Sequence, residues 1–217
     1  LVPLGVDLEN FSPYRRNETL RVELLKGADV LILHCGRMSK EKNPQNSILA
    51  LKELLAAGVN ARLVFVGMGP MFKSLKAISK DLPVTFMGYI VDRKMLGEII
   101  ASADVSIAPG PIETFCLAAL ESLASGTPVV ASATSAVGEF LLLDSREPVG
   151  AIAENDPKSF AAAIQKVLAY SAADRAMPIR CQHQAENYPW SSTLMMMLRL
   201  HGVGHEVSAI HKRLKAA

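Results

Sequence analysis

Cysteine, aromatic residues and an excess of charge of either sign are all scarce in this 217-residue sequence. Its cysteines, Cys35, Cys116 and Cys181, are widely spaced and form no Cys-x-x-Cys pair. They predict neither a disulfide framework nor a zinc knuckle or redox motif, and a reducing compartment is expected. Twenty-three basic residues against 21 acidic ones leave a net charge of +2. This balance disfavours a nucleic-acid partner, so any anion site has to be local.

Long hydrophobic runs are missing as well. No apolar stretch approaches the roughly 18 to 20 residues that span a bilayer, which predicts a soluble or peripheral protein. Half of the residues are nevertheless apolar and 20% are charged, enough for a sizeable core in one large or two small domains and too apolar for disorder. The start, Leu1 to Gly5, has no initiator methionine or signal-peptide pattern, so we expect a fragment of a larger protein.

Short, continuously apolar runs alternate with longer segments of helical period. This pattern predicts an α/β fold with a doubly wound parallel sheet covered by helices on both faces. The predicted strands are residues 30–35, 61–66, 84–87, 104–108 and 128–131, with a weaker sixth at 149–153. The predicted helices are 44–57, 71–80, 93–102, 115–125 and 157–170, the last capped by Asp156. A helical C-terminal tail follows from Asp174, and we assign the three successive methionines of its helix 191–201 to core packing.

Ligands of open parallel sheets bind at the carboxyl ends of the strands, where glycine recurs in this sequence. After the first strand, Arg37 and Lys42 precede Asn43 and Pro44, a predicted N-cap and first helical residue. Two cations beside a helix N-terminus suit a diphosphate. A solvated turn is the alternative, and the strand-end position favours the phosphate site.

Two carboxylates, Glu113 and Glu121, flank the start of the predicted helix 115–125. If both were helical, roughly 12 Å would separate them along the axis. That is too far for the paired carboxylates of a glycosidase, which stand about 5 to 10 Å apart. The spacing suits an elongated ligand whose hydroxyl groups donate to each carboxylate. Judged from the residues alone, a purely structural role is slightly favoured over such a site. Glu121 would then be a partly buried acid of the helix, and Glu113 a charge that the helix dipole stabilises at the N-terminus.

Other patterns in the sequence are weaker. Gly67 and Gly69 resemble the opening of a dinucleotide fingerprint, but Phe72 replaces the third glycine, which disfavours an NAD-dependent oxidoreductase. No Asp-x-Asp pair offers a metal site for a nucleotide-sugar diphosphate. His34 lies in an apolar strand and is interpreted as a satisfied core or rim histidine and not as a base. The basic tail 211–215 is interpreted as a solvated terminus, with contact to anionic lipid as the alternative.

Taken in order, several segments resemble the C-terminal, nucleotide-sugar-binding half of a GT-B fold retaining glycosyltransferase, of the family with the Glu-x7-Glu signature. These segments are Val2 to Asp7 with Phe11, Gly36-Arg37 with Lys42, Ala108 through Glu113 to Glu121, and Gly126 to Val130. A finer resemblance, to actinobacterial GDP-mannose-dependent α-mannosyltransferases, rests on 108–115 and on Tyr188 to Ser191.

The resemblance implies a domain organisation. Residues 1–20 would be an inter-domain hinge segment, 21–172 a nucleotide-sugar-binding Rossmann-like domain, and 173–217 a helical C-terminal tail. The N-terminal domain, which carries the acceptor site in the family, would lie outside this chain. The fragment alone should therefore bind nucleotide without turning it over.

The resemblance also implies a reaction and its residues. Mannose would pass from GDP-mannose to a lipid-linked or glycoside acceptor with retention of configuration, without cofactor or metal, in the cytoplasm or at the inner face of the membrane. Arg37 and Lys42 would neutralise the diphosphate, which stabilises the leaving GDP. Glu113 would bind hydroxyl groups of the donor sugar.

Further residues are implied to bind the donor. Glu121 would hold the ribose, and Tyr89 and Ile90 would lie against the base. The backbone N–H groups at the start of the helix would meet sugar and phosphate oxygens, namely those of Phe115, Cys116 and Leu117. Cys116 stands where the family usually has glycine, and it would need a backbone angle that cysteine tolerates poorly. This departure and the absent domain leave a non-catalytic nucleotide-binding or interaction module as the alternative function.

Overall fold

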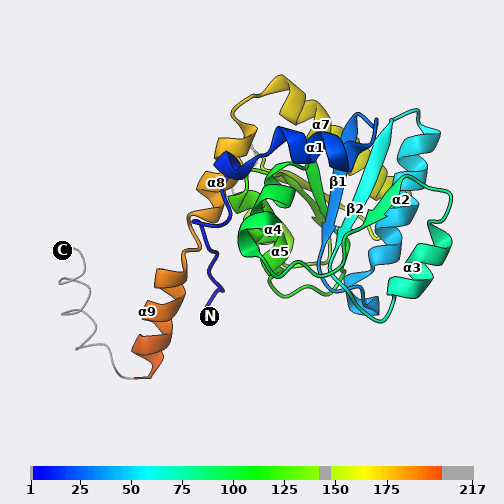
Figure 1. Cartoon of the computed structure of the whole chain (residues 1–217). Helices are drawn as coiled ribbons and strands as arrows, with labels where there is room; N and C mark the ends of the chain where they lie inside the picture. Colours follow the sequence, from blue (N-terminus) through cyan, green and yellow to red (C-terminus); the bar gives the residue numbers. More distant parts are fainter. Residues whose placement is uncertain (1, 142–147, 202–217) are drawn as a thin grey trace.

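A computed structural model of the chain describes residues 2–141 and 148–201. Within them, six parallel strands form one sheet in the order β3-β2-β1-β4-β5-β6 (Figure 1). The strands are β1 Val30–Cys35, β2 Ala61–Val66, β3 Val84–Phe86, β4 Val105–Ala108, β5 Val129–Ser132 and β6 Gly150–Ala153. Their order is that of a doubly wound, Rossmann-like fold, so the predicted fold class is confirmed.

The strands are largely apolar because both faces of the sheet are buried. Leu31, Ile32 and Leu33 of β1 are each 1% exposed. Leu31 and Leu33 belong to one core cluster and Ile32 to the other. Successive side chains thus enter opposite helix layers, which explains why no polar alternation marks these strands in the sequence.

Helices cover both faces of the sheet. One face packs against α2 Pro44–Ala56, α3 Phe72–Ile78 and α7 Pro157–Ala173. The other packs against α1 Glu18–Leu25, α4 Arg93–Ala101, α5 Leu117–Ala124, α6 Val137–Leu141 and α8 Met177–Ala185. Two single 3-10 turns, η1 Pro13–Arg15 and η2 Lys40–Lys42, and α9 Trp190–Leu200 complete the described elements. The predicted cap of α7 is confirmed, since Asp156 Oδ1 accepts from Ser159 N at 2.9 Å.

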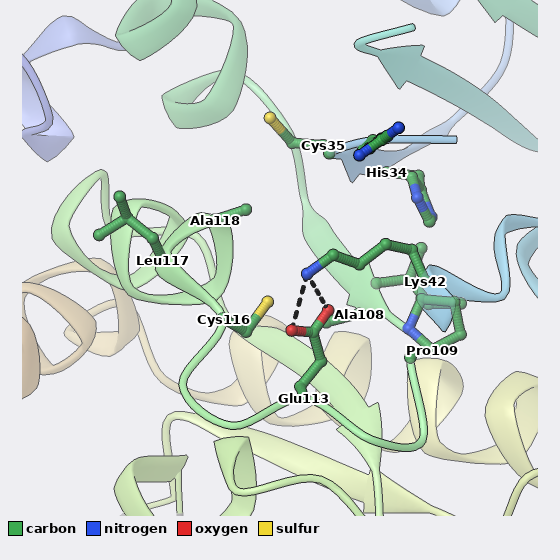
Figure 2. Close-up of a pocket in the computed structure, with 13 residues that line it drawn as sticks. His34, Cys35, Lys42, Ala108, Pro109, Glu113, Cys116, Leu117 and Ala118 are labelled. Atoms are coloured by element: carbon green, nitrogen blue, oxygen red, sulfur yellow. Dashed lines mark hydrogen bonds and ion pairs between the residues drawn. The ribbon is translucent and has the colours of Figure 1, made fainter. Parts of the chain in front are cut away.

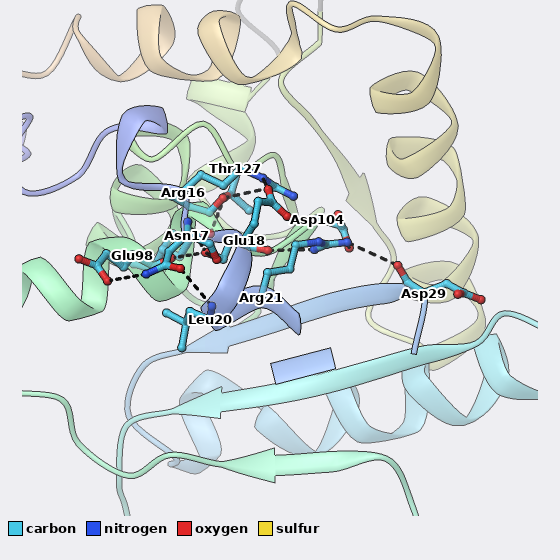
Figure 3. A network of polar contacts seen from close by, with 12 residues as sticks. Arg16, Asn17, Glu18, Leu20, Arg21, Asp29, Glu98, Asp104 and Thr127 are labelled. Carbon is cyan, nitrogen blue, oxygen red and sulfur yellow. Dashed lines mark hydrogen bonds and ion pairs between the residues drawn. The ribbon is translucent and has the colours of Figure 1, made fainter. Parts of the chain in front are cut away.

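Helix α1 was not predicted from the sequence. It runs across residue 20, where the expected hinge segment meets the nucleotide-binding domain. Asn17 caps this helix by accepting a hydrogen bond from Leu20 N at 3.1 Å. Arg21 ties it to the sheet, because Nη2 donates to Asp104 Oδ2 at 2.9 Å (Figure 3). The same oxygen accepts from Leu31 N at 2.7 Å. This network holds α1 at the amino ends of β1 and β4.

The N-terminal segment of the chain meets the link between α8 and α9 and the start of α9 (Figure 1). Val6 N donates to Tyr188 O at 2.9 Å. Gly5 lies so close to Trp190 that a Cβ atom at this glycine would overlap the Trp190 backbone. The segment that resembles the family's hinge is therefore packed against the start of α9.

The structure corrects the assignment of the α9 methionines to the core. Met196 and Met197 are 40% and 48% exposed, whereas Thr193 is 4% exposed. Figure 1 shows α9 extending away from the sheet and its covering helices. The assignment is wrong because apolar residues along one helix face show only that this face can pack. They do not show whether another element of the chain covers it. The rest of the expected tail, including 211–215, lies outside the described residues.

Candidate functional site

The candidate site lies at the topological switch point, where β1 and β4 are neighbours and the chain leaves them in opposite directions. A pocket of about 180 Å³ lies at the carboxyl ends of these strands (Figure 2). Its lining includes several residues predicted for the site, namely Arg37, Lys42, Glu113, Cys116 and Leu117. These side chains therefore lie at the carboxyl ends of the strands, where a ligand site of an open parallel sheet is expected.

An ion pair occupies the centre of this pocket. Lys42 Nζ lies 2.5 Å from Oε1 and 2.7 Å from Oε2 of Glu113 (Figure 2). The Glu113 side chain is 10% exposed and that of Lys42 is 35% exposed. Gly110 packs on the pair, since a Cβ atom there would lie 3.0 Å from Glu113 Oε1. The groups expected to bind phosphate and sugar are thus bound to each other in this structure.

Glu113 lies in the loop before α5 and not on a helix. Because α5 begins at Leu117, the helical spacing assumed for Glu113 and Glu121 does not hold. Glu113 O accepts from Ala136 N at 2.9 Å, which ties the loop to the segment after β5. The loop, and not a helical period, sets the position of the Glu113 carboxylate.

The N-terminus of α5 presents open hydrogen-bond donors. Its N-cap, Cys116, has φ 60° and ψ 77°, in the left-handed region, and makes no side-chain capping hydrogen bond. The unfavourable backbone angle expected for this cysteine is confirmed. Within the described part of the chain, the backbone N–H groups of Phe115, Cys116 and Leu117 have no hydrogen-bond acceptor. These donors and the positive end of the helix dipole suit an anion.

A second pocket of about 380 Å³ adjoins the first and shares Cys35, Gly36 and Arg37 with it. Tyr89 and Ile90, which follow β3, line this second pocket. Tyr89 is 74% exposed. Arg37 is exposed as well, and among residues 2–141 and 148–201 it forms no ion pair. Its guanidinium is therefore available to a ligand that spans both pockets.

Phe115 and Glu121 line neither pocket. The Phe115 ring packs against Phe140 at a centroid distance of 5.9 Å, so the backbone of Phe115 is the part that can serve the site. Glu121 is 6% exposed, and its Oε1 accepts from Arg93 Nη2 at 3.1 Å. Arg93 was not predicted from the sequence as a residue of the site. The available signal was a cation at the start of a predicted helix, which the helix dipole disfavours unless an acid pairs with it.

Burial controls the ionisation of the site. Desolvation raises the pKa of Glu121. It also raises the pKa of the Cys35 thiol to about 12 and that of Cys116 to about 11, so neither is a thiolate nucleophile near neutral pH. Burial lowers the pKa of His34 to about 3, and its Nδ1 lies 2.9 Å from Ser47 Oγ. The interpretation of His34 as a satisfied core or rim histidine is confirmed, because the residue is 3% exposed and also lines the first pocket.

No group of three or more histidine, cysteine, aspartate or glutamate side chains among the described residues is arranged to hold a metal ion. Of the helices in the same part of the chain, none has both the length and the apolar character required to cross a membrane.

The family follows from comparison with known proteins. The family model described as "Glycosyl transferases group 1" matches residues 15–186, a range that contains the lining of both pockets. The chain belongs to this family. The resemblance to a GT-B glycosyltransferase drawn from the sequence is confirmed by this match and by structural neighbours of the same fold.

A curated relative and two solved structures support the assignment of this chain to the group 1 glycosyltransferases. The GDP-mannose-dependent alpha-(1-6)-phosphatidylinositol dimannoside mannosyltransferase of Mycobacterium tuberculosis is 45% identical over 198 residues, which cover 91% of this chain and 50% of that protein. Sucrose-phosphate synthase from Thermosynechococcus elongatus has a TM-score of 0.76 at 25% identity, covering 93% of this chain and 51% of that one. The catalytic domain of cholesterol-alpha-glucosyltransferase from Helicobacter pylori has a TM-score of 0.62 at 27% identity, covering 73% and 98%. The chain thus spans about half the length of the mycobacterial relative.

Proposed function

We propose that this chain is the donor-binding part of a retaining glycosyltransferase that moves mannose from GDP-mannose to a glycolipid or glycoside acceptor. The observation that carries the proposal is the meeting of Arg37, Lys42 and the open N-terminus of α5 at the switch-point pocket. Two cations and a row of N–H donors complement a diphosphate. The choice of GDP-mannose is supported by the 45% identity to an enzyme whose name specifies that donor.

The diphosphate would bind by an exchange of partners. Arg37 is exposed and can bind phosphate oxygens with two parallel hydrogen bonds. Lys42 would turn from Glu113 to the phosphate, and the released Glu113 carboxylate would accept hydroxyl groups of the sugar. The ion pair is then the resting arrangement of two groups that act separately on the donor.

The nucleoside would extend into the second pocket. Tyr89 and Ile90 line it and would contact the base. Glu121 would accept the ribose hydroxyl groups. Arg37 borders both pockets, so the diphosphate would lie between the sugar and the nucleoside.

The proposed transfer retains configuration by attack on the face from which the diphosphate leaves. The bond between sugar C1 and the acceptor oxygen forms as the bond between C1 and the GDP oxygen breaks. The acceptor proton passes to a β-phosphate oxygen of the departing GDP. Arg37, Lys42 and the α5 N–H groups stabilise the negative charge that develops on this phosphate. No metal or cofactor takes part in the proposed transfer. The acceptor would bind to an N-terminal domain. The reaction would take place at the inner face of the membrane.

Calorimetric titration of the chain with GDP, UDP and ADP tests the proposal. We expect GDP to bind most tightly, and Arg37→Ala and Glu121→Ala each to lose about tenfold in affinity, as a lost charge-assisted hydrogen bond predicts. Lys40→Ala is the matched control, because Lys40 is an exposed cation of η2 outside both pockets. Unchanged GDP binding in both site variants would refute the site.

A non-catalytic nucleotide-binding module is the second candidate, and Cys116 favours it because its side chain lines the pocket where the family usually has glycine. A chimera joining this chain to the N-terminal half of the mycobacterial relative separates the two. Mannosyl transfer by the unaltered chimera supports the enzyme. Transfer that requires Cys116→Gly supports the module.

A further inference from the structure

Arg93, the first residue of α4, joins segments that are far apart in the sequence. Its Nη2 donates to Glu121 Oε1 on α5 at 3.1 Å. Its Nε lies 3.5 Å from Asp7 Oδ2, and its guanidinium carbon lies 4.8 Å from the centroid of the Phe11 ring. One cation thus connects a carboxylate of the proposed donor site with the segment 7–11.

The groups that hold Arg93 are themselves fixed. Asp7 Oδ1 accepts from the backbone N–H groups of Glu9 and Asn10 at 3.2 and 3.1 Å, and Oδ2 accepts from Asn10 Nδ2 at 2.7 Å. Phe11 is fully buried. The Arg93 side chain is 49% exposed, but its guanidinium contacts a fixed carboxylate and a fixed ring. These contacts favour one orientation of Arg93 and hence one direction of the Glu121 carboxylate.

Glu121 keeps one oxygen for a ligand. Oε1 accepts from Arg93, and within the described residues Oε2 receives no hydrogen bond. The Glu121 side chain is 8% exposed, and this burial raises its pKa. A protonated carboxyl is a weaker acceptor for ribose hydroxyl groups than a carboxylate. The guanidinium opposes this effect because it lowers the same pKa.

We propose that Arg93 is a positioning residue for nucleotide binding: through Glu121 it holds an ionised carboxylate toward the ribose of the donor. The inference rests on the proposed function, since it takes Glu121 as the ribose ligand. Arg93 acts without touching the nucleotide. Asp7 and Phe11 hold Arg93 in place.

Among the described residues, four ionisable groups face Glu121. Arg93 is the cation among them and comes from α4, whereas Asp7 comes from the N-terminal segment and raises the Glu121 pKa. The other two are the thiols of Cys35, at the end of β1, and Cys116, before α5. Because both thiols are neutral near pH 7, Arg93 and Asp7 are the charges that set the ionisation of Glu121 there.

Calorimetric titration of the 217-residue chain with GDP and with 2′,3′-dideoxy-GDP, between about pH 8 and about pH 6, tests the role of Arg93. In Arg93→Gln, GDP affinity should fall about tenfold near pH 7, while affinity for the dideoxy nucleotide stays unchanged. Without the cation the Glu121 pKa rises further, so GDP affinity should be lost at a higher pH on acidification than in the parent chain. Lys94→Gln, an exposed neighbour on α4, is the matched control.

Three further variants separate positioning from folding. Arg93→Lys should keep the parent pH profile, because it keeps the charge. Asp7→Asn should weaken GDP binding near pH 7 less than Arg93→Gln does, because it removes one contact of Arg93 and leaves the cation beside Glu121. Arg93→Gln combined with Glu121→Gln should bind GDP no more weakly than Glu121→Gln alone.

The outcomes distinguish this inference from the function on which it rests. If the parent chain does not bind GDP, the proposed function fails. If the parent binds GDP and Arg93→Gln binds it equally well, or loses both nucleotides equally, the positioning role is overturned while the proposed function stands.

Discussion

Replacing Glu113 by glutamine should make the chain bind GDP more tightly, even though Glu113 is proposed to contact the donor. Lys42 Nζ lies 2.5 and 2.7 Å from the two Glu113 oxygens, so a diphosphate has to displace this carboxylate before it can use Lys42. A neutral amide at this position competes less for Lys42 and does not repel phosphate. GDP lacks the sugar that Glu113 would bind, so nothing offsets the gain.

The size of the effect follows from the burial of the pair. Exposed ion pairs contribute about 0.2–1 kcal/mol, whereas breaking a buried pair costs about 3–5 kcal/mol. Since the Glu113 side chain is 10% exposed and that of Lys42 is 35% exposed, solvent screens the pair substantially. We expect about 1 kcal/mol, which corresponds to about fivefold tighter GDP binding.

Titration with GDP and with GDP-mannose measures this effect. Glu113→Gln should bind GDP about fivefold more tightly, with a smaller gain or a loss for GDP-mannose, whose sugar loses an acceptor. Glu41→Gln is the control for a removed negative charge, because Glu41 is exposed on η2 and lies outside the pocket. Weaker GDP binding in Glu113→Gln, or an equal gain in Glu41→Gln, would refute competition for Lys42.

Three other changes test the fold around the site. A non-glycine residue in the left-handed region costs about 1–2 kcal/mol, and glycine removes this strain at an entropic cost of about 0.5–1 kcal/mol. Cys116→Gly should therefore raise the thermal unfolding midpoint by about 1–3 °C. A lowered midpoint would contradict the strain at Cys116. Burial lowers the pKa of His34 from its ordinary value of 6.5 to about 3 in the folded chain. Its contribution to the free energy of unfolding is therefore fully present above pH 6.5 and falls with acidification by at most about 1.4 kcal/mol per pH unit. Urea unfolding near pH 7 and pH 5 should therefore show a shallower loss in His34→Gln than in the parent. Asp156→Ala should cost about 1 kcal/mol through the lost cap of α7, seen as a lower unfolding midpoint, while Asp156→Asn should not.

Most of the sheet could be predicted because a parallel strand buried on both faces is a short apolar run whatever surrounds it. Helix α1 could not, since Leu24 is its buried residue and Arg21 binds an acid 83 positions away. A contact so distant leaves no local pattern. Helix α6 has five residues, too few to show a helical period.

The edge of the sheet that carries the site could be predicted, because Arg37, Lys42 and Tyr89 all follow strands. The pairing of its charges could not. Glu113 meets Lys42 across 71 positions, and Glu121 meets a cation 28 positions before it. Both pairs depend on the path of the loop before α5 and on side-chain directions, which residue types and spacing do not determine. The roles of these residues toward a donor stay predictions.

The contact between Gly5 and the start of α9 has an optical consequence. The chain has one tryptophan, Trp190, which is 47% exposed and lies against Gly5. Its indole fluorescence therefore monitors the contact between the N-terminal segment and the start of α9, and not the donor pocket. A molecule that covers α9 would shift this emission to shorter wavelength, whereas a nucleotide that changes it would show that donor binding is transmitted to the segment resembling the hinge.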